Sequence, residues 1–374
     1  DLMYFKILTN SNLSFKDRIK NFISYLQIRR AANIAWSHRY KRVFNIHNEF
    51  KKQLNLEEVE NHKKYWQLFS NNVNTDTYRV CNHTSGMTNP KFIPEEIFMA
   101  DIQPSLNRDT GSKYYNNKSL YYQWVPEVVF PEAYIHNIDG EYLNSNLQTI
   151  SFDEVIAIAN HLSYPVVIKP NKDSGGGKDV FFPNTADELI AILGKSQNLI
   201  VQEKIRQHDF FNKYNEHGLN TIRIVLYRSV KDNKLHVLNT TFRMGLGGSL
   251  DNETAGGIYS LIKKDGSLNG YALDKFGTKY YSHPDTGMDF KGKIPDIENL
   301  WDLTKVVTSK IFYARIISLD ACMDCDQKWR MIEANVFVQH TIRFAQYSGE
   351  PFFNEFTDEV VEYCLKRHWA LEKK

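Results

Sequence analysis

Three oxygen-bearing side chains near the end of the chain have the spacing of a magnesium site. Two strand-like apolar runs flank a turn-prone segment at 324–328. If residues 326–327 form the centre of that turn, Asp320 pairs opposite Glu333, because the two lie equally far from it. Glu333 and Asn335 share one face of their strand. Facing carboxylates repel without a cation, so we expect Asp320, Glu333 and Asn335 to bind Mg²⁺, which prefers oxygen ligands.

A second candidate site combines lysines with successive glycines. Lys169 lies at the end of an apolar run, and the segment 173–178 separates it from a second strand-prone run at 180–182. Glycines let backbone N–H groups approach phosphate oxygens without interference from a Cβ atom, and lysines supply positive charge. We interpret the segment as a hairpin lid over a polyphosphate, and a plain flexible turn is the alternative. The lid residues are Ser174, Gly175, Gly176, Gly177 and Lys178.

Two arginines are expected to point at the same place. A strand beginning at Thr221 carries Arg223, and a turn at 232–233 returns the chain to Arg243. Two arginines aimed at one place are typical of a site for phosphate or carboxylate. A glycine-dense loop follows and contains Asn252. Each arginine alone would more often be a surface ion-pair partner, so only their combination with the neighbouring motifs favours a site.

The segments that carry these residues alternate between strand-like and helical patterns. Ser151 and Glu154 form the Ser-x-x-Glu pattern of a capping box at the start of one helix. The apolar run at 199–202 ends in polar residues, and such a strand end can present backbone groups to an adenine edge and a carboxylate to sugar hydroxyls. The alternation predicts an α/β or α+β architecture. We expect strands at 127–134, 165–169, 199–202 and 316–320, and helices at 151–161 and 185–193.

The N-terminal region is expected to be mainly helical and basic. Apolar residues recur at three- and four-residue spacing from Phe15 to Leu26, which marks one face of an amphipathic helix, and Ser14 is a suitable N-cap. From Lys6 to Arg42, nine basic residues stand against a single acid. This stretch could contact an anionic membrane surface or a polyanionic glycan. The alternative is a solvated helix face.

The composition narrows the class of protein. The 374 residues exceed one ordinary core and suggest two or three lobes. A net charge of +2 argues against nucleic-acid binding as the main activity. No apolar run has the length of a membrane span or the form of a signal peptide, so we expect a cytoplasmic protein. The four cysteines are too few and too scattered for a disulfide framework, and Cys322-x-x-Cys325 alone is weak evidence for zinc, so reduced thiols are expected.

Several blocks of the sequence, taken in order, resemble those of ATP-grasp proteins. Within that superfamily the chain resembles the sugar-transfer-associated proteins, which are found with genes for surface polysaccharide assembly, from about residue 116 to residue 346. Many of these relatives have a glycine where this chain has Asp179. The blocks are NKS at 117–119, IKP at 168–170, SGGGK at 174–178, VQEKI at 201–205, NTIR at 220–223, RMG at 243–245, DN at 251–252, GG at 256–257, HP at 283–284 and EAN at 333–335.

The resemblance implies roles for particular residues. Lysines would hold the phosphates of ATP, and the strand end at 202–205 would bind adenine and ribose. Arg223, Arg243 and Asn252 are best placed to orient an acyl phosphate. The implied nucleotide contacts are Lys118, Lys169, the lid residues, Gln202, Glu203, Lys204 and Ile205, and the implied magnesium ligands are Asp320, Glu333 and Asn335.

The fold implied is α+β, with two α/β lobes that clamp ATP and a mainly helical N-terminal region. We expect the N-terminal region at 1–108, the first lobe at 109–205 and the second at 206–374. The implied activity is a carboxylate–amine ligase that uses ATP and Mg²⁺ and acts through an acyl phosphate. Its substrates would be a uronic acid of a polysaccharide precursor and an amino acid or amine. A kinase of the same fold and a peptide ligase remain alternatives, whereas the full set of lysines, arginines and metal ligands argues against a nucleotide-binding module without chemistry.

Overall fold

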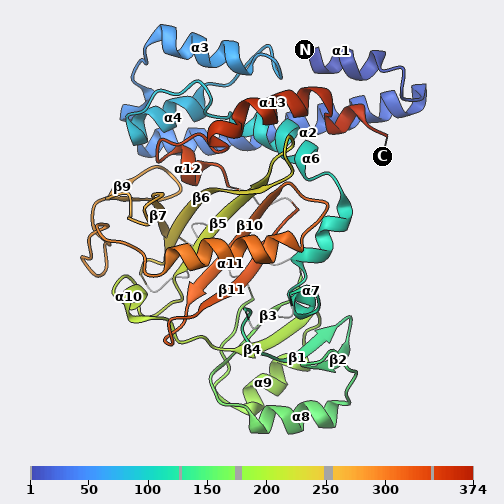
Figure 1. Cartoon of the computed structure of the whole chain (residues 1–374), viewed down its shortest axis with the longest axis vertical. Helices are drawn as coiled ribbons and strands as arrows, with labels where there is room; N and C mark the ends of the chain where they lie inside the picture. Colours follow the sequence, from blue (N-terminus) through green and yellow to red (C-terminus); the bar gives the residue numbers. More distant parts are fainter. Residues whose placement is uncertain (1, 126–128, 173–178, 248–255, 338–340, 374) are drawn as a thin grey trace.

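The computed structural model describes residues 2–125, 129–172, 179–247, 256–337 and 341–373. The chain forms three parts, arranged one above the other in Figure 1. A helical part lies at one end, a seven-stranded antiparallel sheet lies in the middle, and a four-stranded antiparallel sheet lies at the other end. The α+β class with a helical N-terminal region is therefore confirmed. Among the helices described, none combines the length and the hydropathy needed to cross a bilayer.

The helical part joins the N-terminal helices to the last long helix. Leu365 of α13 packs against the apolar cluster that contains Tyr25 of α2. Apolar side chains of α13 pack with Trp66 and Phe98 from the N-terminal region. The division of the chain at residues 108 and 205 stays a prediction, and this packing adds α13 to the N-terminal helices. The elements are α1 (Leu2–Thr9), α2 (Phe15–Ile46), α3 (Leu56–Trp66), α4 (Asp76–Ser85), α5 (Glu95–Ile97), the π-helical turn η2 (Phe98–Ile102), α6 (Gln103–Leu106), α12 (Arg343–Gln346) and α13 (Thr357–Lys366).

Helix α2 begins where the sequence predicts, because the Ser14 side chain accepts a hydrogen bond from the Asp17 backbone N–H. Its buried face, however, is not the apolar stripe that starts at Phe15. Phe15 is 73% exposed, whereas Tyr25 and Arg29 are buried against the carboxylate of Asp101. Most of the apolar stripe of α2 therefore faces outward, although Phe22 packs on Tyr4 of α1.

The small sheet has the strand order β2-β1-β4-β3, and helices α8 and α9 cover one face. The capping box of Ser151 and Glu154 is present at the start of α8. The predicted strands 165–169 and 199–202 are confirmed as β3 and β4. The predicted strand 127–134 is wrong, since the strand begins only at Ala133; residues 126–128 lie outside the described residues. The run at 180–182 contributes only a bridge between Phe181 and Ile168. The elements are β1 (Ala133–Ile138), β2 (Glu141–Asn144), α8 (Phe152–His161), β3 (Val166–Pro170), α9 (Ala186–Leu193) and β4 (Leu199–Glu203).

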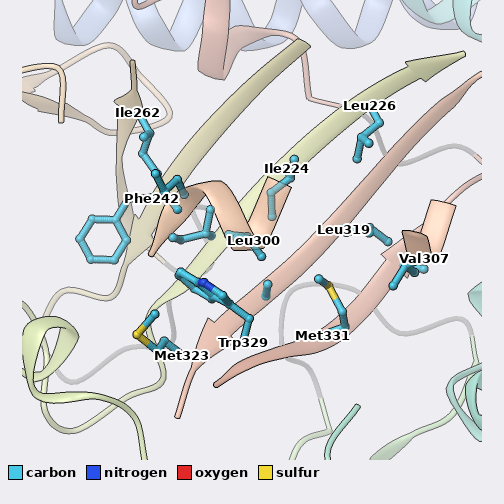
Figure 2. Packing of buried hydrophobic residues seen from close by; sticks show 14 of the residues in the cluster. Ile224, Leu226, Phe242, Ile262, Leu300, Val307, Leu319, Met323, Trp329 and Met331 are labelled. Atoms are coloured by element: carbon cyan, nitrogen blue, oxygen red, sulfur yellow. The ribbon is translucent and has the colours of Figure 1, made fainter. Parts of the chain in front are cut away.

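The large sheet has the order β11-β10-β5-β6-β7-β8-β9. One face packs on α11 through apolar side chains such as Ile224, Phe242 and Leu300 (Figure 2). On the opposite face, Val225 and Tyr227 are covered by the helical part. The other end of that face carries the polar side chains of the candidate site. The elements are β5 (Thr221–Arg228), β6 (Leu235–Met244), β7 (Ile258–Ile262), β8 (Ala272–Leu273), β9 (Lys279–Tyr280), α11 (Ile297–Ser309), β10 (Ile316–Met323) and β11 (Trp329–Asn335).

The hairpin of β10 and β11 pairs Asp320 with Glu333 as expected, although its turn differs from the expected one. Asp324 and Lys328 close a three-residue loop, with the Asp324 N–H donating to the Lys328 carbonyl at 2.9 Å. Gln327 has a φ of 62°, the left-handed conformation common in such loops. A bulge next to Asp320 then shifts the register by one residue. The longer loop and the bulge offset each other, so the predicted pair still forms.

Candidate active site

An ion pair between Lys118 and Glu333 links the segment that precedes the small sheet to the large sheet. The connection runs through the 3-10 helices η3 (Thr110–Asn116) and η4 (Lys118–Leu120) and the short helix α7 (Tyr121–Trp124). The Nζ of Lys118 donates to Oε1 of Glu333 at 2.7 Å, and the Lys118 side chain is 5% exposed. The Lys118 backbone N–H donates to the Asn171 carbonyl at 2.7 Å, next to β3. Lys118 is thus held between both sheets.

Lys169 reaches the same place from β3. Burial, together with the nearby Lys118, lowers the pKa of Lys169 to about 8, although Glu333 acts in the opposite direction. Two ammonium groups therefore stand close to one carboxylate, and ammonium groups of this kind can bind the oxygens of a phosphate.

The two predicted arginines do converge, and they converge on a predicted metal ligand. Arg223 donates from Nε and Nη2 to the two carboxylate oxygens of Asp320, both at 2.7 Å. Arg243 adds a contact to Oδ2 at 3.1 Å. Burial alone would raise the pKa of Asp320, but the two arginines lower it to about 2. The geometry follows from the sheet, since Arg223 lies directly beside Asp320 on the neighbouring strand.

The donor set for a magnesium ion consists of two carboxylates and an amide. Asp320 and Glu333 face each other across β10 and β11, and Asn335 is buried at the end of β11. Within the described part of the chain, no group of three or more His, Cys, Asp or Glu side chains is arranged to hold a metal ion. The oxygens present fit Mg²⁺ in its usual protein mode, in which one or two carboxylates bind it together with phosphates of the substrate.

Gln202 and Glu203, at the strand end predicted to bind adenine, already form contacts within the protein. Gln202 donates from Nε2 to the Tyr122 hydroxyl at 2.6 Å, and its Oε1 is a buried acceptor that has no hydrogen-bond partner. The Glu203 carboxylate pairs with Arg330 and accepts from the Glu132 backbone N–H at 2.8 Å. Gln202 therefore keeps an acceptor for a ligand, whereas Glu203 is already paired.

The next two residues lead out of the small sheet. Lys204 is exposed, and its ammonium lies 5.5 Å from the ring centre of Phe182. Ile205 is half-buried in the segment that leads to the large sheet. The remaining predicted site residues, Ser174, Gly175, Gly176, Gly177, Lys178 and Asn252, lie outside the described residues.

Sequence reasoning missed a histidine on the site-facing side of the small sheet. His136 is fully buried on β1, where both ring nitrogens have no hydrogen-bond partner, and burial lowers its pKa to about 4. Ile200 pairs with His136 on one side and with Lys169 on the other, so the three side chains form one row. His136 is a polar residue among apolar ones, which could have marked it as a candidate. Because the predicted strand ended at residue 134, His136 was not placed on a strand.

The family model described as sugar-transfer associated ATP-grasp matches residues 98–350. No curated protein sequence matches the chain significantly. Among solved structures, N5-carboxyaminoimidazole synthase from Aspergillus clavatus has 9% identity and a TM-score of 0.39, with 67% of this chain and 53% of that chain covered.

Two further solved structures have similar values. The L-amino acid ligase from Bacillus licheniformis has 14% identity and a TM-score of 0.40, with 67% of this chain and 48% of that chain covered. The VanG D-Ala:D-Ser ligase from Enterococcus faecalis has 14% identity and a TM-score of 0.42, with 68% and 64% covered. The chain spans about half the length of the synthase from Aspergillus clavatus and of the ligase from Bacillus licheniformis. At these TM-scores the likeness carries no argument about substrate or reaction.

Proposed function

Because the chain belongs to the sugar-transfer-associated ATP-grasp family, we propose that it is an ATP- and Mg²⁺-dependent carboxylate–amine ligase. The observation that carries the proposal is the meeting of Lys118, Lys169 and Glu333 from three separate elements, beside the Asp320 and arginine cluster. Such a site can neutralise a polyphosphate on one side and an activated carboxylate on the other.

The nucleotide would lie between the two sheets. Lys118 and Lys169 would neutralise its phosphates, and residues 174–178 would cover them. The free acceptor of Gln202 and the chain at 203–205 would contact adenine and ribose. The unpartnered amide oxygen supports this assignment, because a buried polar atom without a partner is costly unless a ligand satisfies it.

Magnesium would be held by Asp320, Glu333 and Asn335. When bound, it would spread the negative charge that develops on the phosphate oxygens. Arg223 and Arg243 hold the pKa of Asp320 at about 2, so Asp320 is ionised at neutral pH. The Glu333 carboxylate is in direct contact with the Lys118 ammonium.

The proposed reaction has two steps. A carboxylate oxygen of the substrate attacks the γ-phosphorus of ATP, so that an acyl phosphate forms and ADP leaves. An amine then attacks the acyl carbon, the C–O bond to phosphate breaks, and orthophosphate leaves. Arg223, Arg243 and Asn252 would orient the acyl phosphate between these steps. We assign the carboxylate to a uronic acid of a polysaccharide precursor, in keeping with the family description.

Hydroxylamine distinguishes this ligase from a kinase of the same fold. In the presence of ATP, Mg²⁺ and a uronic acid substrate, the activated acyl group should be trapped as a hydroxamate. Arg243→Ala should lower trapping roughly a hundred- to a thousandfold, the range for one lost charge-stabilising donor. Lys234→Ala is the matched control, because it removes an exposed cation just beyond the far end of β6. A stable phosphorylated product without hydroxamate would instead identify a kinase.

The protein is also proposed to contact an anionic membrane surface through α1 and α2. The exposed apolar side chains there include Leu2 at 48%, Phe5 at 67%, Phe15 at 73% and Leu26 at 46%. Exposed lysines such as Lys16 lie among them. Apolar side chains beside basic ones are typical of helices that lie in a membrane interface.

Sedimentation with lipid vesicles tests this contact. The protein should sediment with vesicles that contain phosphatidylglycerol more than with phosphatidylcholine alone. Replacing both Phe5 and Phe15 by Ser should reduce sedimentation, because each Phe contributes exposed apolar area. Phe312→Ser is the control, since Phe312 is similarly exposed, at 61%, in the loop before β10. Equal loss in both variants would contradict a specific contact.

A further inference from the structure

A chain of hydrogen bonds beside β4 fixes the direction in which the Gln202 amide points. The Tyr122 hydroxyl donates to the Pro131 carbonyl. A carbonyl can only accept, so the single proton of this hydroxyl is used there. The hydroxyl can then only accept from Gln202, whose Nε2 lies 2.6 Å from it. The amide nitrogen of Gln202 therefore faces Tyr122, and the amide oxygen faces away from it.

The neighbours of the amide hold it in this orientation. Nε2 of Gln202 also lies 3.5 Å from the Pro131 carbonyl oxygen, which is a second acceptor. A turned amide would bring its oxygen next to that carbonyl oxygen and to a hydroxyl whose proton is already used. The Tyr122 ring is itself packed edge-on against Phe130 and His136, with ring centres 6.0 Å and 6.1 Å away. The hydroxyl that orients Gln202 is thus held in place by the core around it.

The amide oxygen of Gln202 is the side of the group that a ligand would meet. Gln202 is 3% exposed, and its Oε1 has no hydrogen-bond partner among the residues that the structure describes. A buried acceptor of this kind is costly unless a ligand or a water molecule donates to it. Because the nitrogen is engaged with Tyr122, Gln202 offers a ligand an acceptor and no donor.

Gln202 lies on the face of the small sheet that carries Lys169. The adjacent residue, Val201, packs with the apolar side chains of α8 and α9, so Gln202 points to the opposite face. On that face Lys169 pairs with Ile200, two residues before Gln202 on β4. Lys169 and Gln202 are therefore diagonal neighbours, about 7–8 Å apart. A nucleotide whose phosphates contact Lys169 would have its base within reach of the Gln202 amide.

Purine bases differ at the position that such an acceptor can distinguish. Adenine has an amino group on carbon 6, which donates hydrogen bonds, whereas guanine has a carbonyl there, which only accepts. Hypoxanthine has the same 6-carbonyl. The Gln202 oxygen would pair with the amino group and would oppose the carbonyl oxygen. An amide that was free to turn over would offer its NH₂ group to the carbonyl and would lose this preference.

We propose that Gln202 selects adenine over 6-oxopurines, and that Tyr122 is a positioning residue that keeps the Gln202 amide from turning over. The proposal rests on the proposed function, since it takes the base of a nucleotide to lie at Gln202. Tyr122 acts through Gln202, because its hydroxyl is used within the protein by the Pro131 carbonyl and the Gln202 amide.

Calorimetry with ADP and IDP on the full chain tests the proposal, because the two bases differ only at carbon 6 and the adjoining ring nitrogen. With Mg²⁺ present and no carboxylate substrate, the wild type should bind ADP roughly ten- to a hundredfold more tightly than IDP. Tyr122→Phe should reduce this ratio about fivefold or more, mainly because IDP binds more tightly than before. Loss of a purely structural contact would not strengthen the binding of either nucleotide.

Two further variants complete the test. Gln202→Leu removes the acceptor, so it should weaken ADP binding about tenfold and bring the ratio close to one. Tyr142→Phe is the matched control for Tyr122→Phe. Its hydroxyl also donates to a backbone carbonyl, that of Leu193 at 3.0 Å, but on the helix-covered side of the same sheet. This variant should keep the wild-type ratio.

Three results would overturn the proposal. They are equal affinities of the wild type for ADP and IDP, an equal weakening of both nucleotides in Tyr122→Phe, and a wild-type ratio in Gln202→Leu. The Gln202→Leu arm decides the question even if Tyr122→Phe does not fold. Failure of the ligase proposal is seen separately, since calorimetry involves no carboxylate substrate. Equal affinities together with normal hydroxamate trapping would contradict only the inference about the base, whereas a protein that binds neither nucleotide would contradict both proposals.

Discussion

ATP binding should depend on pH through Lys169. The pKa of this residue is about 8 because of burial and the nearby Lys118. Lys169 is therefore about half protonated at pH 8 and about nine-tenths protonated at pH 7. Phosphate oxygens favour the charged ammonium, so nucleotide binding should raise the pKa and draw in a proton. The expected uptake is about half a proton at pH 8 and about a tenth at pH 7.

The same linkage fixes the direction in which affinity changes. As the pH rises through 8, the free protein loses the proton that the complex needs, so the affinity for ATP should fall. The fall between pH 7 and pH 9 should be about tenfold, because the protonated fraction of Lys169 in the free protein drops from about nine-tenths to about a tenth over that range. Lys169→Arg provides the matched variant, since arginine stays charged throughout and should bind without proton uptake.

Calorimetry in buffers with different ionisation enthalpies measures the proton uptake directly. A non-hydrolysable ATP analogue with Mg²⁺ keeps chemistry from contributing to the heat. The reasoning is refuted if wild-type protein takes up no proton at pH 8, or if the uptake persists unchanged in Lys169→Arg. A variant that still binds the analogue, but with affinity independent of pH from 7 to 9, would identify Lys169 as the titrating group.

Three further predictions concern single carboxylates. Glu333→Gln should leave the fold intact but lower magnesium-dependent ADP release roughly a hundredfold, and normal turnover across a magnesium titration would contradict a metal role. Asp320→Asn should lower the free energy of unfolding at pH 7 by about 2 kcal/mol, because a pKa near 2 instead of 3.8 contributes stability above pH 4 that is lost as the pH falls through 2. Urea denaturation measures this, and an unchanged midpoint would be inconsistent with the Arg223 contact.

The third carboxylate is Glu96, whose pKa burial raises to about 7. From pH 4.5 to 7 it ionises in the unfolded chain but stays protonated in the folded one, so its contribution to stability falls by about 3 kcal/mol as the pH rises. The gain from Glu96→Gln in urea denaturation should therefore grow between pH 5 and pH 8, and a difference that is independent of pH would contradict this burial.

Local patterns in the sequence determined several elements correctly. The capping box of Ser151 and Glu154, the N-cap at Ser14 and the apolar runs of β3 and β4 depend only on near neighbours in the chain. Short-range hydrogen bonds and strand periodicity decide these features. The first strand was misplaced because the apolar run at 127–134 gave no sign that pairing with β4 would start at Ala133.

The pairing of Asp320 with Glu333 shows the limit of such reasoning. A two-residue turn was expected, whereas a three-residue loop and a bulge produce the same pair. A bulge costs one unpaired residue and depends on packing from both sides of the sheet, so no local pattern predicts it.

By itself, the sequence determined which residues carry the charges, the order of the elements and the family to which the chain is similar. Only the tertiary structure decided which of those charges meet. Asp320 and Arg223 are 97 positions apart in the chain, and Lys118 and Glu333 are 215 apart, so their contacts exist only once the sheets have formed. Tertiary structure also decided which face of α2 is buried. The periodicity of the sequence predicts an apolar and a polar face, but packing against the rest of the chain selects the buried one.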